Sequence, residues 1–303
     1  MARRESEYCG ILLVNKEKNM TSHDCVNIVR RGFQTGRVGH TGTLDPMATG
    51  LLPICVGKAT KLADLICDGR KKYRACFKLG IRTDTLDITG QITEEREPVR
   101  DEKKILEAVN SFLGKSMQLP PMYSAKKING KKLYELARKG EECERTPCEI
   151  EIFSIDTEKI NVEEATAEIT VSCSKGTYIR SLIDDIGEKL GCFAAMTSLE
   201  RIETGGFSLS DNRLCEIAEI KESTPEKLSE KLIAPDEFFG ECRKITLDER
   251  NERFFTNGIR IRIEGKKDEI LKVYSPEGKF IALGKIYEEN DKSLRMGVFK
   301  SFY

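Results

Sequence analysis

Between residues 165 and 191 the hydrophobic pattern of the chain changes from a period of two to a helical period. Apolar and polar residues alternate from Ala165 to Cys173, which is typical of a half-buried strand. Directly afterwards apolar residues return at helical spacing from Ile179 to Leu190, and Gly191 supplies a stop signal. A strand that leads straight into an amphipathic helix predicts a body of the α+β class.

The rest of the first 240 residues continues this mixture. Strands are expected at 10–14 and 73–79, and helices at 23–33, 59–67, 101–112, 213–220 and 225–232. Thr21 and Ser22 are N-cap candidates for the first of these helices, and Thr224 with Pro225 for the last. Residues 39–53 are expected to form a loop, because glycine and proline recur there without a sustained period.

Two segments differ in texture from this body. Residues 119–148 are polar and rich in lysine, and they are expected to form an excursion from the core. From residue 244 onward, short β-rich segments are separated by glycines, which predicts a small β-barrel-like domain. We place the domain boundary near residue 240, with a catalytic body at 1–240 and the small domain at 241–303.

Composition excludes several classes of protein. No apolar run approaches the roughly 20 residues that a membrane span needs, and no secretory signal is recognised at the start, so a cytoplasmic protein is expected. The 11 cysteines include no Cys-x-x-Cys pair and the two histidines are His23 and His40, so neither a disulfide framework nor a metal site is expected.

Charge permits binding of a nucleic acid without demonstrating it. Fifty basic and fifty acidic residues cancel, whereas nucleic-acid binders are usually basic. Phosphates respond to the local field, and basic residues cluster at 70–74 and 126–139. For each cluster alone, a solvated face balanced by acids elsewhere is an equally good interpretation.

The segment Gly39 to Gly50 presents one imidazole, His40, and one carboxylate, Asp45, on a glycine-rich loop. Catalytic groups are often carried by such loops. Taken alone, Asp45 followed by proline is better explained as an ordinary turn. Gly57 to Thr60 is similar to the end of a phosphate-binding P-loop, but alanine stands where the Mg²⁺-ligating hydroxyl belongs, so that interpretation is rejected.

The Gly39 to Gly50 segment closely resembles the signature loop of the bacterial tRNA pseudouridine-55 synthases, the TruB-type family. Further blocks agree with that family in the same order along residues 10–207: Lys71-Lys72-Tyr73-Arg74, Gly80 to Gly90, Pro120 to Lys126 with Tyr134 to Gly140, and Cys173 to Arg180. Ordered blocks of this kind are hard to obtain by chance. The resemblance implies a mixed-sheet catalytic domain with an RNA-gripping insertion at 119–148 and, at 241–303, a PUA-type RNA-binding domain.

The resemblance also implies the roles of three catalytic residues. Asp45 would be the carboxylate that acts at C1′ of the target uridine, either as a nucleophile or by helping to form a glycal. Arg180 would pair with Asp45 and lower its pKa. Tyr73 would stack on the extruded uracil, and its phenol would be a candidate base. No cofactor and no metal would be required.

The remaining implied contacts are with the substrate. Substrate-binding roles are expected for His40, Tyr178, Leu199 and Lys16. Contacts with the RNA backbone are expected for Lys72, Arg74, Lys126, Lys127, Lys131 and Lys132. The implied partner is the T stem-loop of tRNA, in which position 55 would be isomerised, and the protein would act as a monomer with no obligatory protein partner and no membrane.

Two departures from the family pattern affect these expectations. The family usually carries Lys-Pro-x-Gly after its first strand, whereas this chain has Lys16-Glu17-Lys18-Asn19. Asn19 is still able to adopt a left-handed conformation, and Lys16 to pack beneath the active loop. Glu200 occupies a place where a second basic residue commonly precedes Arg201, which weakens an expected phosphate contact.

Two other functions are compatible with the same scaffold. An RNA-binding or tRNA-folding helper without turnover is disfavoured, because Asp45, Tyr73 and Arg180 are all present. The catalytic subunit of a guide-RNA particle acting on ribosomal RNA is disfavoured by the long 119–148 segment, which those relatives generally lack.

Overall fold

The computed structural model describes residues 7–124, 127–128, 131–137, 140 and 143–303. Lys126 lies outside the described residues, and so do the side chains of Lys127, Lys131 and Lys132. The contacts that we expected from these four lysines therefore stay predictions.

The main sheet contains the strands β1 (Gly10–Lys16), β2 (Val38–His40), β3 (Thr49–Val56), β4 (Lys71–Leu79), β7 (Gly114–Gln118), β10 (Cys148–Asn161), β11 (Thr166–Cys173), β12 (Ala194–Thr204), β13 (Phe207–Ser208) and β14 (Cys215–Glu216). In the described residues these ten strands follow the order β14-β1-β3-β12-β4-β11-β10-β7, with β2 paired to β3 and β13 to β12. The β1–β14 and β3–β12 pairs are parallel and the others antiparallel. The α+β class with a mixed sheet is confirmed.

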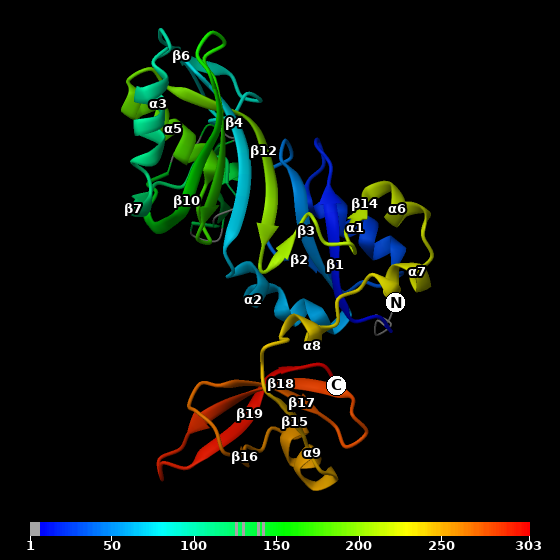
Figure 1. Ribbon diagram of the computed structural model, residues 1–303. Helices are drawn as coiled ribbons and strands as arrows, with labels where there is room; N and C mark the ends of the chain where they lie inside the picture. Colours follow the sequence, from blue (N-terminus) through cyan, green and yellow to red (C-terminus); the bar gives the residue numbers. More distant parts are fainter. Residues whose placement is uncertain (1–6, 125–126, 129–130, 138–139, 141–142) are drawn as a thin grey trace.

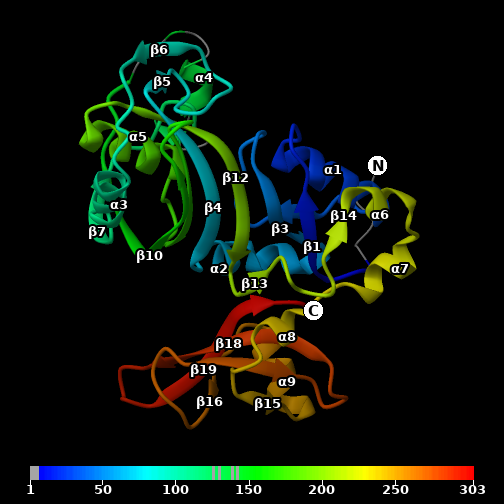
Figure 2. The same ribbon diagram turned by 45° about the horizontal axis from the view of Figure 1, so that its top comes forward.

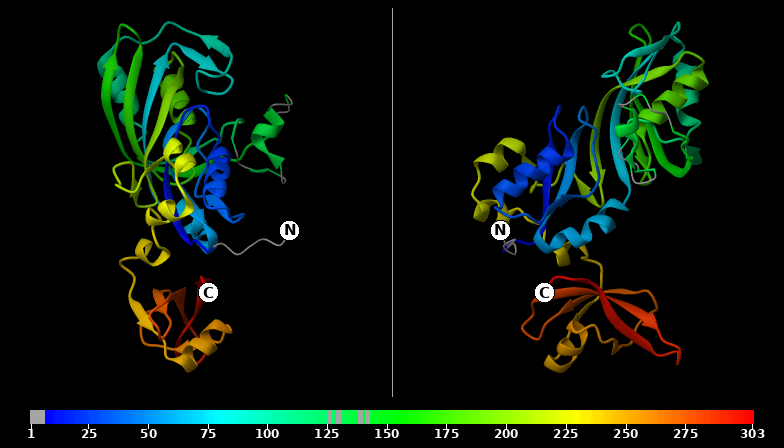
Figure 3. Two further views of the ribbon diagram at one scale, coloured as in Figure 1. Left: turned by 90° about the vertical axis from the view of Figure 1, so that its right-hand side faces the viewer. Right: turned by 180° about the vertical axis from the view of Figure 1, so that it is seen from behind.

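Helices and short strand pairs complete the body. They are α1 (Ser22–Gly32), the 3₁₀ helix η1 (Gly57–Leu62), α2 (Ala63–Cys67), α3 (Glu102–Asn110), α4 (Leu133–Ala137), α5 (Ile179–Leu190), α6 (Ile217–Glu222), α7 (Pro225–Glu230) and α8 (Pro235–Phe238), with the pairs β5 (Ile81–Thr83)–β6 (Ile92–Glu95) and β8 (Lys127–Ile128)–β9 (Lys131–Lys132). The segment that carries β8, β9 and α4 projects away from the main sheet (Figure 3, left).

Most expected elements are present, with shifted ends. Thr21 caps α1 through a reciprocal hydrogen-bond pair with Asp24, and Gly191 ends α5 with a φ of 73°. The loop expected at 39–53 is shorter, because β2 runs to His40 and β3 begins at Thr49. The helix expected at 59–67 begins as a 3₁₀ turn, and α6 begins later than expected.

The C-terminal region forms a second sheet with the order β15 (Lys244–Thr246), β17 (Ile270–Tyr274), β18 (Phe280–Glu288), β19 (Leu294–Ser301) and β16 (Ile261–Arg262). The β-rich texture predicted this sheet. It did not predict α9 (Glu249–Thr256), because that helix is largely polar and buries a single phenylalanine, Phe255. None of the helices in the described ranges is long and apolar enough to cross a membrane.

The two faces of the main sheet bury different clusters. On one face, α1, α3, α5 and α6 cover residues such as Val14, Ile54 and Tyr73. On the other face, Ile11, Leu13, Leu51 and Cys55 form a cluster with η1 and α2. Figures 1 and 2 show the C-terminal sheet on this second side, at α2 and α8.

The second cluster also includes C-terminal residues, so the two sheets share one apolar core. Leu283 and Phe302 are buried in it, and Phe238 packs its ring 5.3 Å from that of Phe207. The Lys61 Nζ atom donates to the Ser301 backbone oxygen at 2.7 Å and to its hydroxyl at 2.6 Å. The C-terminal domain is therefore packed against the body instead of being tethered by a free linker.

We expect Phe302→Ala to destabilise the protein by about 3 kcal/mol, because burying a phenylalanine ring contributes this much and its removal leaves a cavity. The ring is 7% exposed and lies 5.1 Å from that of Phe280. Urea unfolding followed by circular dichroism measures the change. The neighbouring Tyr303→Ala is the control, since this side chain is 43% exposed. Equal unfolding midpoints for the two variants would show that the junction contributes little.

Candidate active site

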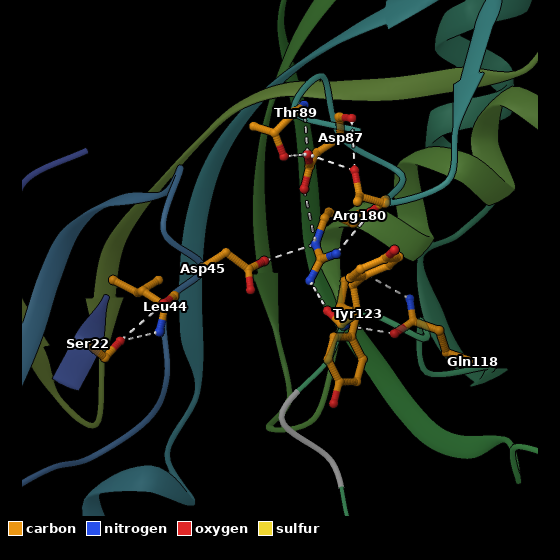
Figure 4. Close-up of polar contacts among 10 residues, drawn as sticks. Ser22, Leu44, Asp45, Asp87, Thr89, Gln118, Tyr123 and Arg180 are labelled. Carbon is orange, nitrogen blue, oxygen red and sulfur yellow. Dashed lines mark hydrogen bonds and ion pairs between the residues drawn. The ribbon is translucent and has the colours of Figure 1, made fainter. Parts of the chain in front are cut away.

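Asp45 lies in the loop between β2 and β3, and its position is set first by Ser22. The Ser22 hydroxyl accepts a hydrogen bond from the Leu44 amide at 2.8 Å and donates to the Leu44 carbonyl at 3.1 Å. Ser22 is 3% exposed, at the first position of α1. This reciprocal pair fixes the residue before the carboxylate to the start of a helix (Figure 4).

The residue after the carboxylate, Pro46, is held from the other side. Its carbonyl accepts hydrogen bonds from the Asn19 amide at 2.8 Å and from Lys16 Nζ at 3.3 Å. Asn19 has a φ of 67°, so the left-handed conformation expected from the sequence is confirmed. Both neighbours of Asp45 are thus pinned, which restricts where its side chain can point.

Lys16 does not line an open pocket. It is fully buried, and it also donates to the carbonyls of Glu17 and Met20. Burial lowers the pKa of Lys16 to about 8. The burial of Lys16 does not fit the predicted contact with the substrate. Its hydrogen bond to Pro46 fits the other expectation, that Lys16 packs beneath the active loop.

Arg201 supports the inner side of the same loop. Its Nε atom donates to the Leu51 carbonyl at 2.8 Å and its Nη2 atom to the Gly42 carbonyl at 3.2 Å. Arg201 is 1% exposed, so the phosphate contact considered for it is excluded. Its backbone pairs with Gly50, where an added Cβ would lie 2.5 Å from the Arg201 carbonyl oxygen. Glycine is required at position 50 for this close approach.

Arg180 is the buried cation of the site, in the first turn of α5. Its Nε atom lies 2.9 Å from an Asp45 carboxylate oxygen, which confirms the pairing predicted from the sequence. Its Nη1 and Nη2 atoms donate to the carbonyls of Thr85 at 2.9 Å and Tyr123 at 2.7 Å. The guanidinium is therefore held in one orientation by three separate segments of the chain (Figure 4).

A second carboxylate, Asp87, lies 3.8 Å from Arg180 Nε and was not predicted as a site residue. It is 4% exposed, and it accepts hydrogen bonds from the Thr85 hydroxyl and from both the amide and the hydroxyl of Thr89. Asp45 and Asp87 thus approach the same nitrogen atom of Arg180. Its position within the family-like block at 80–90 was the signal that could have found it.

The environment of Asp45 raises its pKa overall, although Arg180 lowers it as we expected. Burial is the largest cause and the charge of Asp87 adds to it, while the ion pair with Arg180 opposes both. A third of the side chain stays exposed, so the carboxylate remains reachable from outside. The ion pair and its lowering effect on the pKa were therefore predicted correctly, whereas the burial that outweighs this effect was not predicted.

Tyr73 lies on the active-site face of β4 and is 7% exposed. Burial raises the pKa of its phenol, a nearby Arg201 guanidinium lowers it, and the charge of Asp45 raises it again. Leu199, on β12, is 7% exposed and pairs with Ala75 of the same strand β4. Tyr178 is partly exposed at the N-cap of α5.

His40 ends β2 and is partly exposed, and its Nδ1 atom accepts a hydrogen bond from the Gly42 amide at 3.3 Å. Burial lowers the pKa of His40, and the charges of Arg201 and His23 lower it further. A neutral imidazole at the start of the loop that carries Asp45 is consistent with the substrate-binding role predicted for His40.

Lys72 and Arg74 occupy the face of β4 opposite to Tyr73, because side chains alternate along a strand. Arg74 pairs with Glu200 at 2.9 Å and with Glu168 at 3.5 Å, and Lys72 lies 3.9 Å from Glu203. Lys72 and Arg74 therefore do not line a cleft together with Tyr73. Any contact of theirs with RNA stays a prediction, and it would be made on the far face of the sheet.

No cluster of three or more His, Cys, Asp or Glu side chains suitable for a metal ion occurs among the described residues. The arrangement around Asp45 instead combines a partly exposed carboxylate, a buried guanidinium and a buried phenol. In such a site the carboxylate can attack an electron-poor carbon. The guanidinium stabilises the charge of the carboxylate before the attack and after its departure.

Two solved structures share the fold over nearly the whole chain. A chain of the structure described as "Crystal Structure of a Cbf5-Nop10-Gar1 Complex" aligns with a TM-score of 0.72 and 23% identity, covering 97% of this chain and 85% of that chain. A chain of the archaeal box H/ACA sRNP Nop10-Cbf5 complex aligns with a TM-score of 0.69 and 21% identity, covering 99% and 87%. The fold class is therefore that of the Cbf5 chains.

Sequence comparison identifies the family. The model described as "TruB family pseudouridylate synthase (N terminal domain)" matches residues 30–179, and the one described as "tRNA pseudouridylate synthase B C-terminal domain" matches residues 180–238. A protein called tRNA pseudouridine synthase B from Clostridium tetani is 42% identical over 95% of this chain and 99% of its own length. One of the same name from Oceanobacillus iheyensis is 40% identical over 94% and 95%. The chain belongs to the TruB family of pseudouridylate synthases.

We expect Ser22→Ala to slow the chemical step about 10- to 100-fold, since the loop would lose the bonds that fix Leu44 and small misplacements of a reacting group are costly. RNA affinity should change little, because the buried hydroxyl contacts the Leu44 backbone. Single-turnover rates at saturating protein, compared with a binding titration, separate the two effects. The control is Ser210→Ala on the exposed surface. An unchanged rate for Ser22→Ala would contradict the role of this pair.

The acid limb of the pH–rate profile should lie above pH 4, the usual range for aspartate, because the ionised form of Asp45 is the active one and its pKa is raised. Activity should therefore fall as the pH drops through that raised pKa. Arg180→Met removes the opposing charge and should move the limb to higher pH, whereas Asp87→Asn should move it to lower pH. Single-turnover profiles of both variants test this pair of opposite shifts. A shift in the same direction for both would refute the electrostatic assignment.

Proposed function

We propose that this protein isomerises uridine to pseudouridine in the T loop of tRNA, at position 55. The ion pair between Asp45 and Arg180 carries this proposal. It joins, at 2.9 Å, the two residues that the family resemblance implies as the catalytic carboxylate and its partner. The relatives called tRNA pseudouridine synthase B support tRNA as the substrate, since they match over nearly the full length of both chains.

In the proposed reaction, the C1′–N1 bond of the target uridine breaks, the uracil turns, and a C5–C1′ bond forms. The proton lost from C5 is balanced by one gained at N1, so no oxidant or reductant is consumed. Asp45 assists cleavage at C1′, as a covalent nucleophile or through a glycal. Arg180 stabilises the ionised form of Asp45. Asp45 has to be ionised to act at C1′.

Tyr73 is assigned to stacking on the flipped uracil. Its raised pKa makes the phenolate form rarer at neutral pH, which disfavours the alternative role as a general base. Tyr178, Leu199 and His40 complete the proposed nucleotide pocket, with the imidazole beside the opened loop. Extrusion is part of the proposal because the reacting C1′ and base edge are inaccessible within a folded T loop.

RNA contacts are proposed at two places outside the pocket. Residues 119–148 would grip the T stem through Lys126, Lys127, Lys131 and Lys132, and residues 241–303 would act as a PUA-like RNA-binding domain beside the catalytic domain at 1–240. The projection of β8, β9 and α4 from the main sheet supports the first contact (Figure 3). The protein is proposed to act as a cytoplasmic monomer, without a protein partner and without a cofactor.

The likeness to the Cbf5 chains raises a second possibility, a guide-RNA-dependent subunit that modifies ribosomal RNA. At 21–23% identity this likeness extends to the fold, whereas relatives at 40–42% identity carry the name of the stand-alone synthase. The tRNA synthase is therefore the function that we propose. The RNA-folding helper is the outcome expected if binding occurs without turnover.

Tritium release from a tRNA transcript that carries [5-³H]uridine tests the proposal, with mapping of the modified position. We expect stoichiometric release from the T-loop uridine and none with Asp45→Asn, because the amide cannot supply the carboxylate chemistry. The affinity of Asp45→Asn for tRNA should stay within several-fold of the wild type. Asp156→Asn, an exposed exchange on β10, is the matched control and should retain full release. A fully active Asp45→Asn protein would rule out the assignment, and binding without release by the wild type would favour the helper.

A further inference from the structure

Gln118 is a buried polar side chain for which the proposed chemistry gives no role. It is the last residue of β7 and is 4% exposed. Its Nε2 atom donates to the Tyr178 carbonyl at 3.0 Å, and its Oε1 atom accepts from the Tyr178 amide at 2.8 Å. One side-chain amide therefore pairs with both backbone groups of a single residue, 60 positions away along the chain (Figure 4).

The residue that Gln118 holds is the N-cap of α5. Within the described part of the chain, this helix lacks a capping hydrogen bond from its own N-cap side chain. The first amides of a helix have no partner inside it, and leaving a buried one without a hydrogen bond is costly. Gln118 therefore fixes Tyr178, the residue just before α5 and two residues before Arg180.

Two further contacts join the same pair of segments. The Ser181 hydroxyl donates to the Leu119 carbonyl at 3.3 Å, and Arg180 Nη2 donates to the Tyr123 carbonyl at 2.7 Å. Residues 118–123 thus meet residues 178–181 at successive points. The Arg180–Asp45 ion pair lies next to this junction, and the chain leads from the junction into the projecting segment that carries β8, β9 and α4.

We propose that Gln118 is a positioning residue that aligns Arg180 and Tyr178 for the reaction and ties their alignment to the root of the RNA-gripping segment. The inference rests on the proposed function and deepens it. Gln118 does not touch the reacting atoms. Gln118 acts by fixing the start of α5, which carries Arg180. From there the Arg180 Nε atom reaches Asp45, and the Nη2 atom donates to the Tyr123 carbonyl.

The geometry explains why such a residue is needed. Arg180 donates from three nitrogen atoms to partners on different segments, so a shift of α5 along its axis cannot be absorbed by rotating the side chain. A misplacement of about 1 Å away from the chemistry is enough to slow a reaction roughly 100-fold. Because Arg180 opposes the raised pKa of Asp45, a loosened Arg180 would also let that pKa rise further.

The test uses Gln118→Met, which keeps the length and volume of the side chain and removes both hydrogen bonds. We expect the single-turnover rate at saturating full-length protein to fall about 10- to 100-fold, while the Kd for tRNA stays within about threefold. The acid limb of the pH–rate profile should move to higher pH. Gln34→Met, the same exchange at an exposed position, should leave all three quantities unchanged.

A purely structural role for Gln118 predicts a different result: a lower unfolding midpoint with an unshifted acid limb, and this would overturn the proposal. If Gln118→Met fails to fold, Gln118→Glu keeps the acceptor for the Tyr178 amide and is measured in the same way. In an Arg180→Lys background, the effect of the Gln118 exchange should shrink, because it acts through that arginine. An equal loss in both backgrounds would refute the inference.

The same assay separates this inference from the proposed function. A wild-type protein that releases no tritium from tRNA rejects the proposed function, and the positioning role falls with it. An active wild type with a fully active Gln118→Met variant rejects the positioning role alone.

Discussion

The site depends on keeping one guanidinium charged and oriented inside the protein. A buried cation is tolerated only where opposite charges and hydrogen-bond acceptors replace water. Arg180 meets this condition with the Asp45 carboxylate, with the carbonyls of Thr85 and Tyr123, and with the charge of Asp87. These groups come from three separate parts of the chain, because Thr85 and Asp87 share one segment, so the folded arrangement of the whole body is what allows the ion pair to form.

The main sheet brings these parts together at its centre. The loop with Asp45 leads into β3, Tyr73 lies on β4, and β12 runs between these two strands. β12 can lie against β3 because Gly50 leaves room for the backbone of Arg201, whose side chain then supports the loop from below. The carboxylate consequently sits on a rigid frame, pinned at Leu44 and Pro46, and only its outer side faces solvent.

The sequence predicted the groups that are encoded locally. Asp45, Arg180 and Tyr73 stand in recognisable blocks, and Thr21 and Gly191 mark the helix ends that they form. It did not predict contacts between distant residues, such as Ser22 with Leu44 or Gln118 with Tyr178, because each partner alone reads as an ordinary polar residue. For Lys72 and Arg74 the strand alternation was available, and it already placed them on the face opposite to Tyr73. The net pKa shift of Asp45 was beyond sequence reasoning, because burial, its largest cause, is a property of the fold.

Charges on the far face of the main sheet are partly paired. On the far face of β4, Lys72 and Arg74 are matched by Glu200, Glu168 and Glu203 on neighbouring strands, so these two side chains offer phosphates little attraction. The C-terminal sheet packs against that same side of the main sheet, over β1 and β3, through the shared apolar cluster. Core packing therefore fixes the distance between the C-terminal sheet and Asp45. If the C-terminal domain contacts RNA as proposed, it does so from a position that core packing fixes, and an RNA is selected by its shape as much as by the local field.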